Sequence, residues 1–149
     1  MTHFFQPTVT EEILARIEKL TPDTKPLWGK MTVAQMLAHN YYSFEAATGK
    51  VVVPRSLLGR IIGQFVRDSF LSNMPLSKNS PTMPRLIVKD ERDFDVEKQK
   101  LISIVKEFSS GGPEKVTQAP HSFFGHFTPE EWSRQMYKHL DHHLQQFGV

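Results

Sequence analysis

The chain of 149 residues contains no cysteine. Disulfide bonds, thiolate metal sites and a cysteine nucleophile are therefore excluded. A chain without cysteine suits a reducing compartment, where disulfides do not form. We therefore expect a cytoplasmic protein.

Long hydrophobic runs are also missing. No stretch approaches the ~20 apolar residues that a membrane-spanning helix requires. The first residues, up to Pro7, contain neither a basic region nor a long apolar run. We therefore expect no signal peptide and no association with a membrane.

Neither sign of charge dominates the sequence. The 18 basic and 16 acidic side chains give a formal net charge of +2, and the two signs are interleaved. The densest basic positions, Arg55, Arg60 and Arg67, are spread along one segment, so the basic patch typical of a nucleic-acid-binding protein is absent. With 39% hydrophobic and 23% charged residues, the composition is that of a soluble globular protein, and the length fits a single domain over residues 1–149.

Several common catalytic motifs are absent as well. Gly111 and Gly112 are isolated and followed by a proline, so they do not form a phosphate-binding loop. The zinc-protease pattern His-Glu-x-x-His does not occur, and neither Ser56 nor Ser122 lies in a nucleophile elbow.

Helix starts are marked by threonines with capping-box spacing to a Glu or Gln. These pairs are Thr8 with Glu11, Thr32 with Gln35, and Thr128 with Glu131. Together with apolar residues at helical spacing, they predict helices over residues 8–20, 32–48 and 128–147. Gly49 and Gly148 stand where glycine commonly ends a helix.

Two more helices are predicted in the middle of the chain. One starts at Pro54 and is shorter, with an apolar stripe formed by Leu57, Leu58, Ile61, Ile62, Phe65 and Val66. The other starts at Asp93 or Asp95 and ends near Phe108, with its inward side formed by Val96, Leu101, Ile104, Val105 and Phe108. Residues 69–85 and 115–127 are predicted as long loops. Four longer helices and a shorter one indicate an all-α helical bundle.

Three histidines lie close together in the last helix, at His139, His142 and His143. Residues four apart on a helix point about 40° apart around its axis, so His139 and His143 can bind the same ion. Imidazole is a common ligand of zinc, copper, nickel and iron. The same side of the helix carries Trp132, Met136, Leu140, Leu144 and Phe147, which directs the pair toward the interior. The alternative is a solvated histidine-rich helix end that complements the helix dipole.

A catalytic zinc site usually has three protein ligands. His39, His121, His126 or a carboxylate can supply the third. His39 lies off the main apolar stripe of its helix, and it reaches the interior only if that helix is buried on more than one side. A lone histidine in such a place is often a hydrogen-bonded core residue. His121 and His126 belong to the loop before the last helix, either as a pocket wall or as exposed residues beside an apolar plug.

The sequence resembles the DinB-like superfamily (DinB/YfiT-like) of metal-binding four-helix bundles, and within it a subfamily of unknown function. The resemblance is carried by the segment Met31–His39, by the entry Thr128–Trp132 and by the segment His139–His143. Residues 51–89 contain no motif that can be aligned.

The resemblance implies that His39, His139 and His143 bind one divalent metal ion, zinc or nickel. It also implies an up-down-down-up bundle, here with an extra short helix and two long loops. Some members of the superfamily are transferases or isomerases that use low-molecular-weight thiols such as bacillithiol or mycothiol.

Two kinds of function follow from a three-histidine site. The first is a metal-dependent enzyme, a thiol-dependent S-transferase or a hydrolase, that acts on a small molecule. Its base is expected among His126, His142, Tyr42 and Glu45. The second is a non-catalytic metal-binding or stress-response domain with a structural metal, which a fourth ligand would favour.

Two possible partner surfaces lie in the middle of the chain. An apo bundle that binds a partner protein through the basic segment 55–67 is a further alternative. A homodimer is also possible, with Leu57, Ile61 and Phe65 at the contact.

Overall fold

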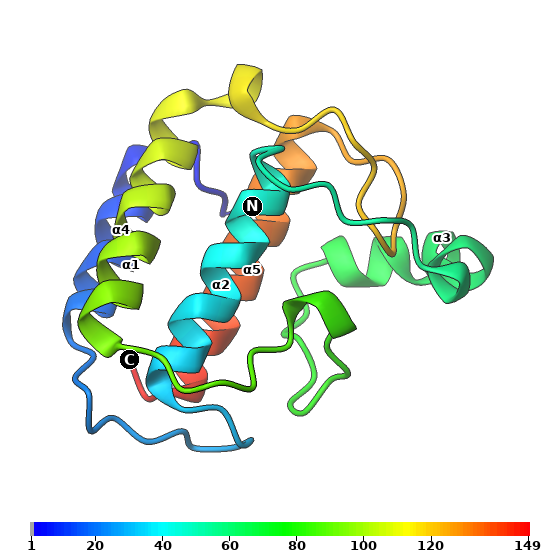
Figure 1. Cartoon of the computed structure of the whole chain (residues 1–149). Helices are drawn as coiled ribbons and strands as arrows, with labels where there is room; N and C mark the ends of the chain where they lie inside the picture. Colours follow the sequence, from blue (N-terminus) through cyan, green and yellow to red (C-terminus); the bar gives the residue numbers. More distant parts are fainter. Residues whose placement is uncertain (1) are drawn as a thin grey trace.

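The computed structural model describes residues 2–149 as a helical bundle with an extra helix beside it (Figure 1). The bundle helices are α1 (Pro7–Glu18), α2 (Val33–Ala47), α4 (Phe94–Gly111) and α5 (Pro129–Gln146). The extra helix is α3 (Leu57–Leu71), and two short 3-10 turns are η1 (Pro84–Leu86) and η2 (Pro113–Lys115). These described residues contain no strand, only an isolated bridge between His121 and Gly125. The predicted all-α bundle is therefore confirmed.

The bundle helices have the directions that the resemblance implies. In Figure 1, α1 and α5 run one way while α2 and α4 run the other, which is the up-down-down-up order. α2 packs against both α4 and α5, so it is buried on more than one side. None of the helices within residues 2–149 is long and apolar enough to cross a membrane.

A cluster of phenylalanines closes one end of the core. Phe4, which precedes α1, packs edge-to-face on Phe44 of α2 and Phe108 of α4, with ring centroids 5.4 and 6.1 Å away. All three side chains are fully or almost fully buried. Burial of such aromatic area is a main source of bundle stability.

Two of the three predicted capping boxes are confirmed. Thr32 accepts a hydrogen bond from the backbone N–H of Gln35, whose side chain accepts one from Thr32 N–H, and α2 ends before Gly49 as expected. Thr128 and Glu131 form the same reciprocal pair at the start of α5.

The capping box at Thr8 is wrong. Helix α1 starts one residue earlier, at Pro7, and its N-cap is Gln6, which makes no side-chain capping bond. Proline suits the first helical position because its missing N–H would have no partner there. Thr8 is therefore already inside the helix, where its hydroxyl cannot cap.

This difference predicts unequal effects for two matched substitutions. Thr128→Ala should lower the free energy of unfolding by about 1 kcal/mol, because it removes a capping bond. Thr8→Ala should leave it nearly unchanged, because exposed Thr8 caps nothing. Urea unfolding of both variants measures this, and equal losses would contradict the cap assignment.

Helix α3 differs most from expectation. It starts at Leu57 with Ser56 as N-cap, not at Pro54, and it continues through residues 69–71, which were predicted as loop. With 15 residues it is as long as α2, so it is not a short helix.

Part of the apolar stripe of α3, formed by Leu57, Ile61 and Phe65, faces away from the bundle. The exposed fraction reaches 80% at Leu57 and 86% at Phe65. The reason is that the glycine side of the helix packs inward. A Cβ at Gly59 or Gly63 would collide with the backbone of Phe123, so only glycine permits this close approach. The homodimer expected at the exposed stripe stays a prediction.

Helix α4 begins after Asp93, whose carboxylate accepts the Val96 N–H, and it runs three residues beyond the predicted end at Phe108, to Gly111. The remaining inward residues are buried as predicted, but Val96 is exposed.

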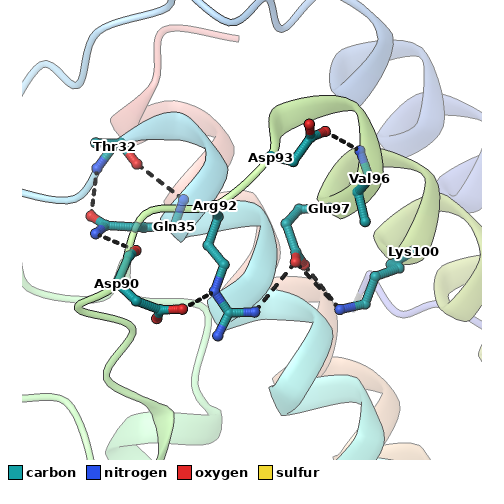
Figure 2. Close-up of polar contacts among 8 residues, drawn as sticks. All are labelled: Thr32, Gln35, Asp90, Arg92, Asp93, Val96, Glu97 and Lys100. Carbon is teal, nitrogen blue, oxygen red and sulfur yellow. Dashed lines mark hydrogen bonds and ion pairs between the residues drawn. The ribbon is translucent and has the colours of Figure 1, made fainter.

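A polar network joins the start of α4 to the start of α2 (Figure 2). The buried carboxylate of Glu97 pairs with Arg92 at 3.3 Å and with Lys100 at 3.2 Å. Gln35 of the α2 capping box donates to the carbonyl of Asp90. These contacts hold the two parallel helices in register at one end of the bundle.

Candidate metal centre

Three histidines from two helices meet between α2 and α5. The ring centroids of His39, His139 and His143 are 4.8 to 4.9 Å apart in all three pairs. One ligand atom of each residue lies within 4.8 Å of the other two, and this is the only such group of three found in residues 2–149. The structure therefore brings together the three residues that the sequence predicted as ligands.

His39 reaches this place because α2 is enclosed on two sides. It lies off the main apolar stripe, yet only 2% of it is exposed. Ser43, one turn further along, is also buried, and its hydroxyl donates a hydrogen bond to the carbonyl oxygen of His39. A small residue at this position leaves room for the imidazole rings of α5.

The protonation of His39 is fixed by the backbone. Its Nδ1 lies 2.8 Å from the carbonyl oxygen of Leu86 in η1. A carbonyl only accepts hydrogen bonds, so Nδ1 carries the proton and Nε2 presents a lone pair. This is the arrangement that a metal-ligating histidine normally has.

The protonation of His143 is fixed by a relay of two hydrogen bonds. The amide nitrogen of Gln146 donates to the carbonyl of Trp28 at 2.8 Å, which orients the amide. Its Oε1 then lies 2.8 Å from Nδ1 of His143. An amide oxygen only accepts, so Nδ1 of His143 carries the proton of this hydrogen bond. Nε2 of His143 is thereby left as the free ligand atom.

His139 completes the triad and contacts the ring of His39. Its Nε2 lies 3.0 Å from Nε2 of His39. Two lone pairs repel at this distance unless a proton or a cation lies between them. Two imidazole nitrogens that share a tetrahedral zinc ion are about 3.3 Å apart. The observed spacing therefore fits a shared metal ion, and Nδ1 of His139 is a buried atom without a partner.

The three rings are neutral near pH 7. Burial lowers the pKa of His39, and it lowers the pKa of His139 well below its usual value, helped by the neighbouring histidines. Burial and the proximity of His39 lower the pKa of His143 to about 3. Neutral imidazoles are the form that binds metal, because a proton would occupy the same lone pair.

The triad opens into a chamber of about 730 Å³. All three histidines line it. Its other walls include the α3 side chains Leu58, Val66 and Phe70 and most of residues 74–83, so part of the segment without a recognisable motif covers the site. The three histidines can therefore hold an ion on one side, while the chamber on the other side gives a small molecule access to that ion.

One of the four residues predicted as possible bases lies in the chamber. His142 lines it, with its ring 5.3 Å from that of His143 and 5.5 Å from that of Trp28. Neither Tyr42 nor Glu45 lines the chamber.

The two loop histidines have different positions. His126 is exposed and does not line the chamber, so the structure does not bring it to the triad. His121 does line the chamber, as a pocket wall. Its Nδ1 accepts the backbone N–H groups of Phe123 and Phe124, and its ring packs 5.3 Å from Trp132.

Three supporting groups were not anticipated from the sequence. Gln146 follows His143 by one helical turn, so its spacing could have revealed it. The carbonyl groups of Leu86, in η1, and of Trp28, in a loop, are indicated by no sequence signal.

A family model described as "Protein of unknown function (DUF1569)" matches residues 5–148 of the chain. Comparisons with curated proteins and with solved structures find no match.

Proposed function

Because this match spans nearly the whole chain, the protein belongs to the DUF1569 family, and on that premise we propose that it is a metal-dependent enzyme acting on a small molecule. The family is part of the DinB/YfiT-like superfamily, and the chain carries a histidine triad that can hold a metal ion. Within this proposal, zinc or nickel is the ion and a low-molecular-weight thiol is the co-substrate.

The observation that supports an enzyme is the pairing of three neutral ligands with an open chamber. A structural zinc site is normally closed by four protein ligands, whereas a catalytic site keeps one position for water or substrate. The ligand triad includes no carboxylate, and His126, the fourth ligand considered for a structural site, is exposed elsewhere. The chamber beside the triad supplies access for a substrate.

Each residue of the site then has a task. His39, His139 and His143 would hold the ion, and Leu86 O and Gln146 Oε1 keep two of the rings in the ligating form. A divalent ion at this place would lower the pKa of a thiol or a water molecule and so provide a nucleophile at neutral pH.

In this proposal His142 accepts the released proton. It is half-buried in the chamber wall, and burial lowers its pKa, so the ring is neutral and can act as a base near pH 7. Packing against Trp28 fixes its ring.

The proposal is tested with metal-loaded protein and two classes of reaction. One is conjugation of low-molecular-weight thiols to a fluorogenic electrophile such as monochlorobimane, and the other is hydrolysis of an activated ester. His142→Ala should lower kcat by about 100-fold or more while the metal content stays at the wild-type level. The control His126→Ala should keep full activity.

Two results would count against an enzyme. One is no turnover with any thiol or ester despite a full complement of metal. The other is a large loss of melting temperature on chelation, which would favour the structural metal of a non-catalytic domain.

A further inference from the structure

The chamber above the histidines is free of acidic side chains. The chain has 16 aspartates and glutamates, and none of them lines the chamber. Its lining does include two lysines, Lys30 and Lys138. A cavity with basic groups and no carboxylate attracts anions and disfavours cations.

The positive charges around the chamber are not neutralised by neighbours. No ion pair within residues 2–149 involves Lys30, Lys78 or Lys138. Lys138 donates to the carbonyl groups of Phe70 and Ser72, which fixes its position without cancelling its charge. Lys78 holds its ammonium group 4.6 Å above the ring of Trp28, which belongs to the chamber wall.

The proposed metal ion would add to this imbalance. Three neutral imidazoles leave the charge of a divalent ion uncompensated, and no carboxylate of the chamber wall offsets it. In a partly buried site such charge interacts more strongly than in water. This step rests on the proposed function, whereas the lysines act with or without metal.

The remaining walls are largely apolar. They include Met31, Leu58, Phe70, Met74, Phe123 and Phe124. A volume of about 730 Å³ lies within the usual range for sites that enclose a small organic ligand. Inorganic phosphate or sulfate would satisfy the charge but would leave these surfaces uncovered.

We propose that the chamber binds an organic anion with an apolar body. The anionic group lies toward the lysines and the triad, and the apolar body lies against the inner side of α3 and residues 74–83. Binding is thus selective for charge sign as well as for shape.

A pair of fluorescent probes with similar aromatic bodies tests this. Anilinonaphthalene sulfonate is an apolar anion, and phenylnaphthylamine is its uncharged relative. The sulfonate should bind metal-free protein about tenfold more tightly than the amine, as expected for one charge-assisted contact. Loading with zinc should increase that ratio.

Matched variants locate the binding. Lys30→Gln should remove most of the advantage of the sulfonate, while Lys106→Gln, at an exposed position of α4, should not. Leu58→Ser should weaken both probes because Leu58 lines the chamber. Leu57→Ser should weaken neither, because this neighbour belongs to the outer face of α3.

Equal binding of the two probes to metal-free protein would overturn the proposal, and so would a larger effect of Leu57→Ser than of Leu58→Ser. Elemental analysis of the same samples separates this from the proposed function. A protein without metal that still prefers the sulfonate supports the charge inference alone.

A different observation concerns two buried atoms behind the triad. Nδ1 of His139 and Oε1 of Gln135 both lack a hydrogen-bond partner. The two residues are one turn apart on α5, and both line the chamber and a neighbouring cavity of about 60 Å³. When Nε2 of His139 is a ligand, its Nδ1 becomes a donor, and Oε1 of Gln135 is an unused acceptor.

We infer that Gln135 is a positioning residue for His139. Its Oε1 accepts the Nδ1 proton through a water molecule in the small cavity, which is large enough to hold one. His39 and His143 already have such acceptors, so Gln135 completes the set.

Zinc titration of wild type, Gln135→Leu and Gln135→Glu tests this second inference. Gln135→Leu should weaken zinc binding about tenfold, and Gln135→Glu should restore it, because the carboxylate is again an acceptor. Wild-type affinity in Gln135→Leu, or equal loss in both variants, would overturn it. A wild type that binds no zinc would instead refute the metal site itself.

Discussion

Replacing Gln146 by leucine is expected to weaken metal binding by about 10- to 100-fold. Leucine has a similar volume but cannot accept the Nδ1 proton of His143. The His143 ring is then free to place its proton on Nε2, which removes the ligand lone pair. The same change also releases the contact with the carbonyl of Trp28. Competition titration with a chelator measures the dissociation constant.

The neighbouring Gln145 provides the matched control. It is exposed and donates to Asp141 on the outer side of α5. Gln145→Leu should therefore leave metal affinity unchanged. Equal losses in the two variants would show that Gln146 acts through general helix stability and not through His143.

The second large effect is a loss of stability in metal-free protein as the pH falls. Burial and the charge of Arg55 lower the pKa of His121 to about 4, from 6.5 for an unperturbed ring. The folded state therefore binds fewer protons than the unfolded state between these values. The contribution of His121 to the free energy of unfolding is therefore complete above about pH 7. As the pH falls toward 4, about 3 kcal/mol of this free energy is lost.

Substitution of His121 by asparagine isolates this contribution. The Oδ1 of asparagine can replace Nδ1 as acceptor for the N–H groups of Phe123 and Phe124, but it does not titrate. The free energy of unfolding by urea should fall between pH 7 and pH 4 by about 3 kcal/mol less in His121→Asn than in wild type. Parallel pH profiles would show that His121 is not buried as a neutral ring.

The features predicted correctly from the sequence are those that depend on neighbouring residues. Capping at Thr32 and Thr128 is decided within four residues, and the histidine pair of α5 follows from helical spacing. The assignment of His39 as the third ligand depended on the family resemblance, because the burial of His39 depends on how α2 packs against two other helices.

The features that the sequence did not reveal depend on tertiary packing. The apolar pattern of α3 does not show which side of this helix packs inward, whereas in the structure Gly59 and Gly63 allow their side to approach Phe123 closely. The carbonyl of Leu86, which fixes the tautomer of His39, comes from a residue 47 positions away in the chain. The periodicity of apolar residues in the sequence does not indicate such a contact.

The most direct test of the account is elemental analysis of protein purified without a histidine tag, together with the variants His39→Ala and His143→Ala. The account predicts about one zinc or nickel ion per wild-type chain, and a loss of that ion in both variants, because each removes one of three ligands. Circular dichroism of the variants controls for the fold. A folded wild-type protein that takes up no metal after incubation with zinc or nickel would contradict the account.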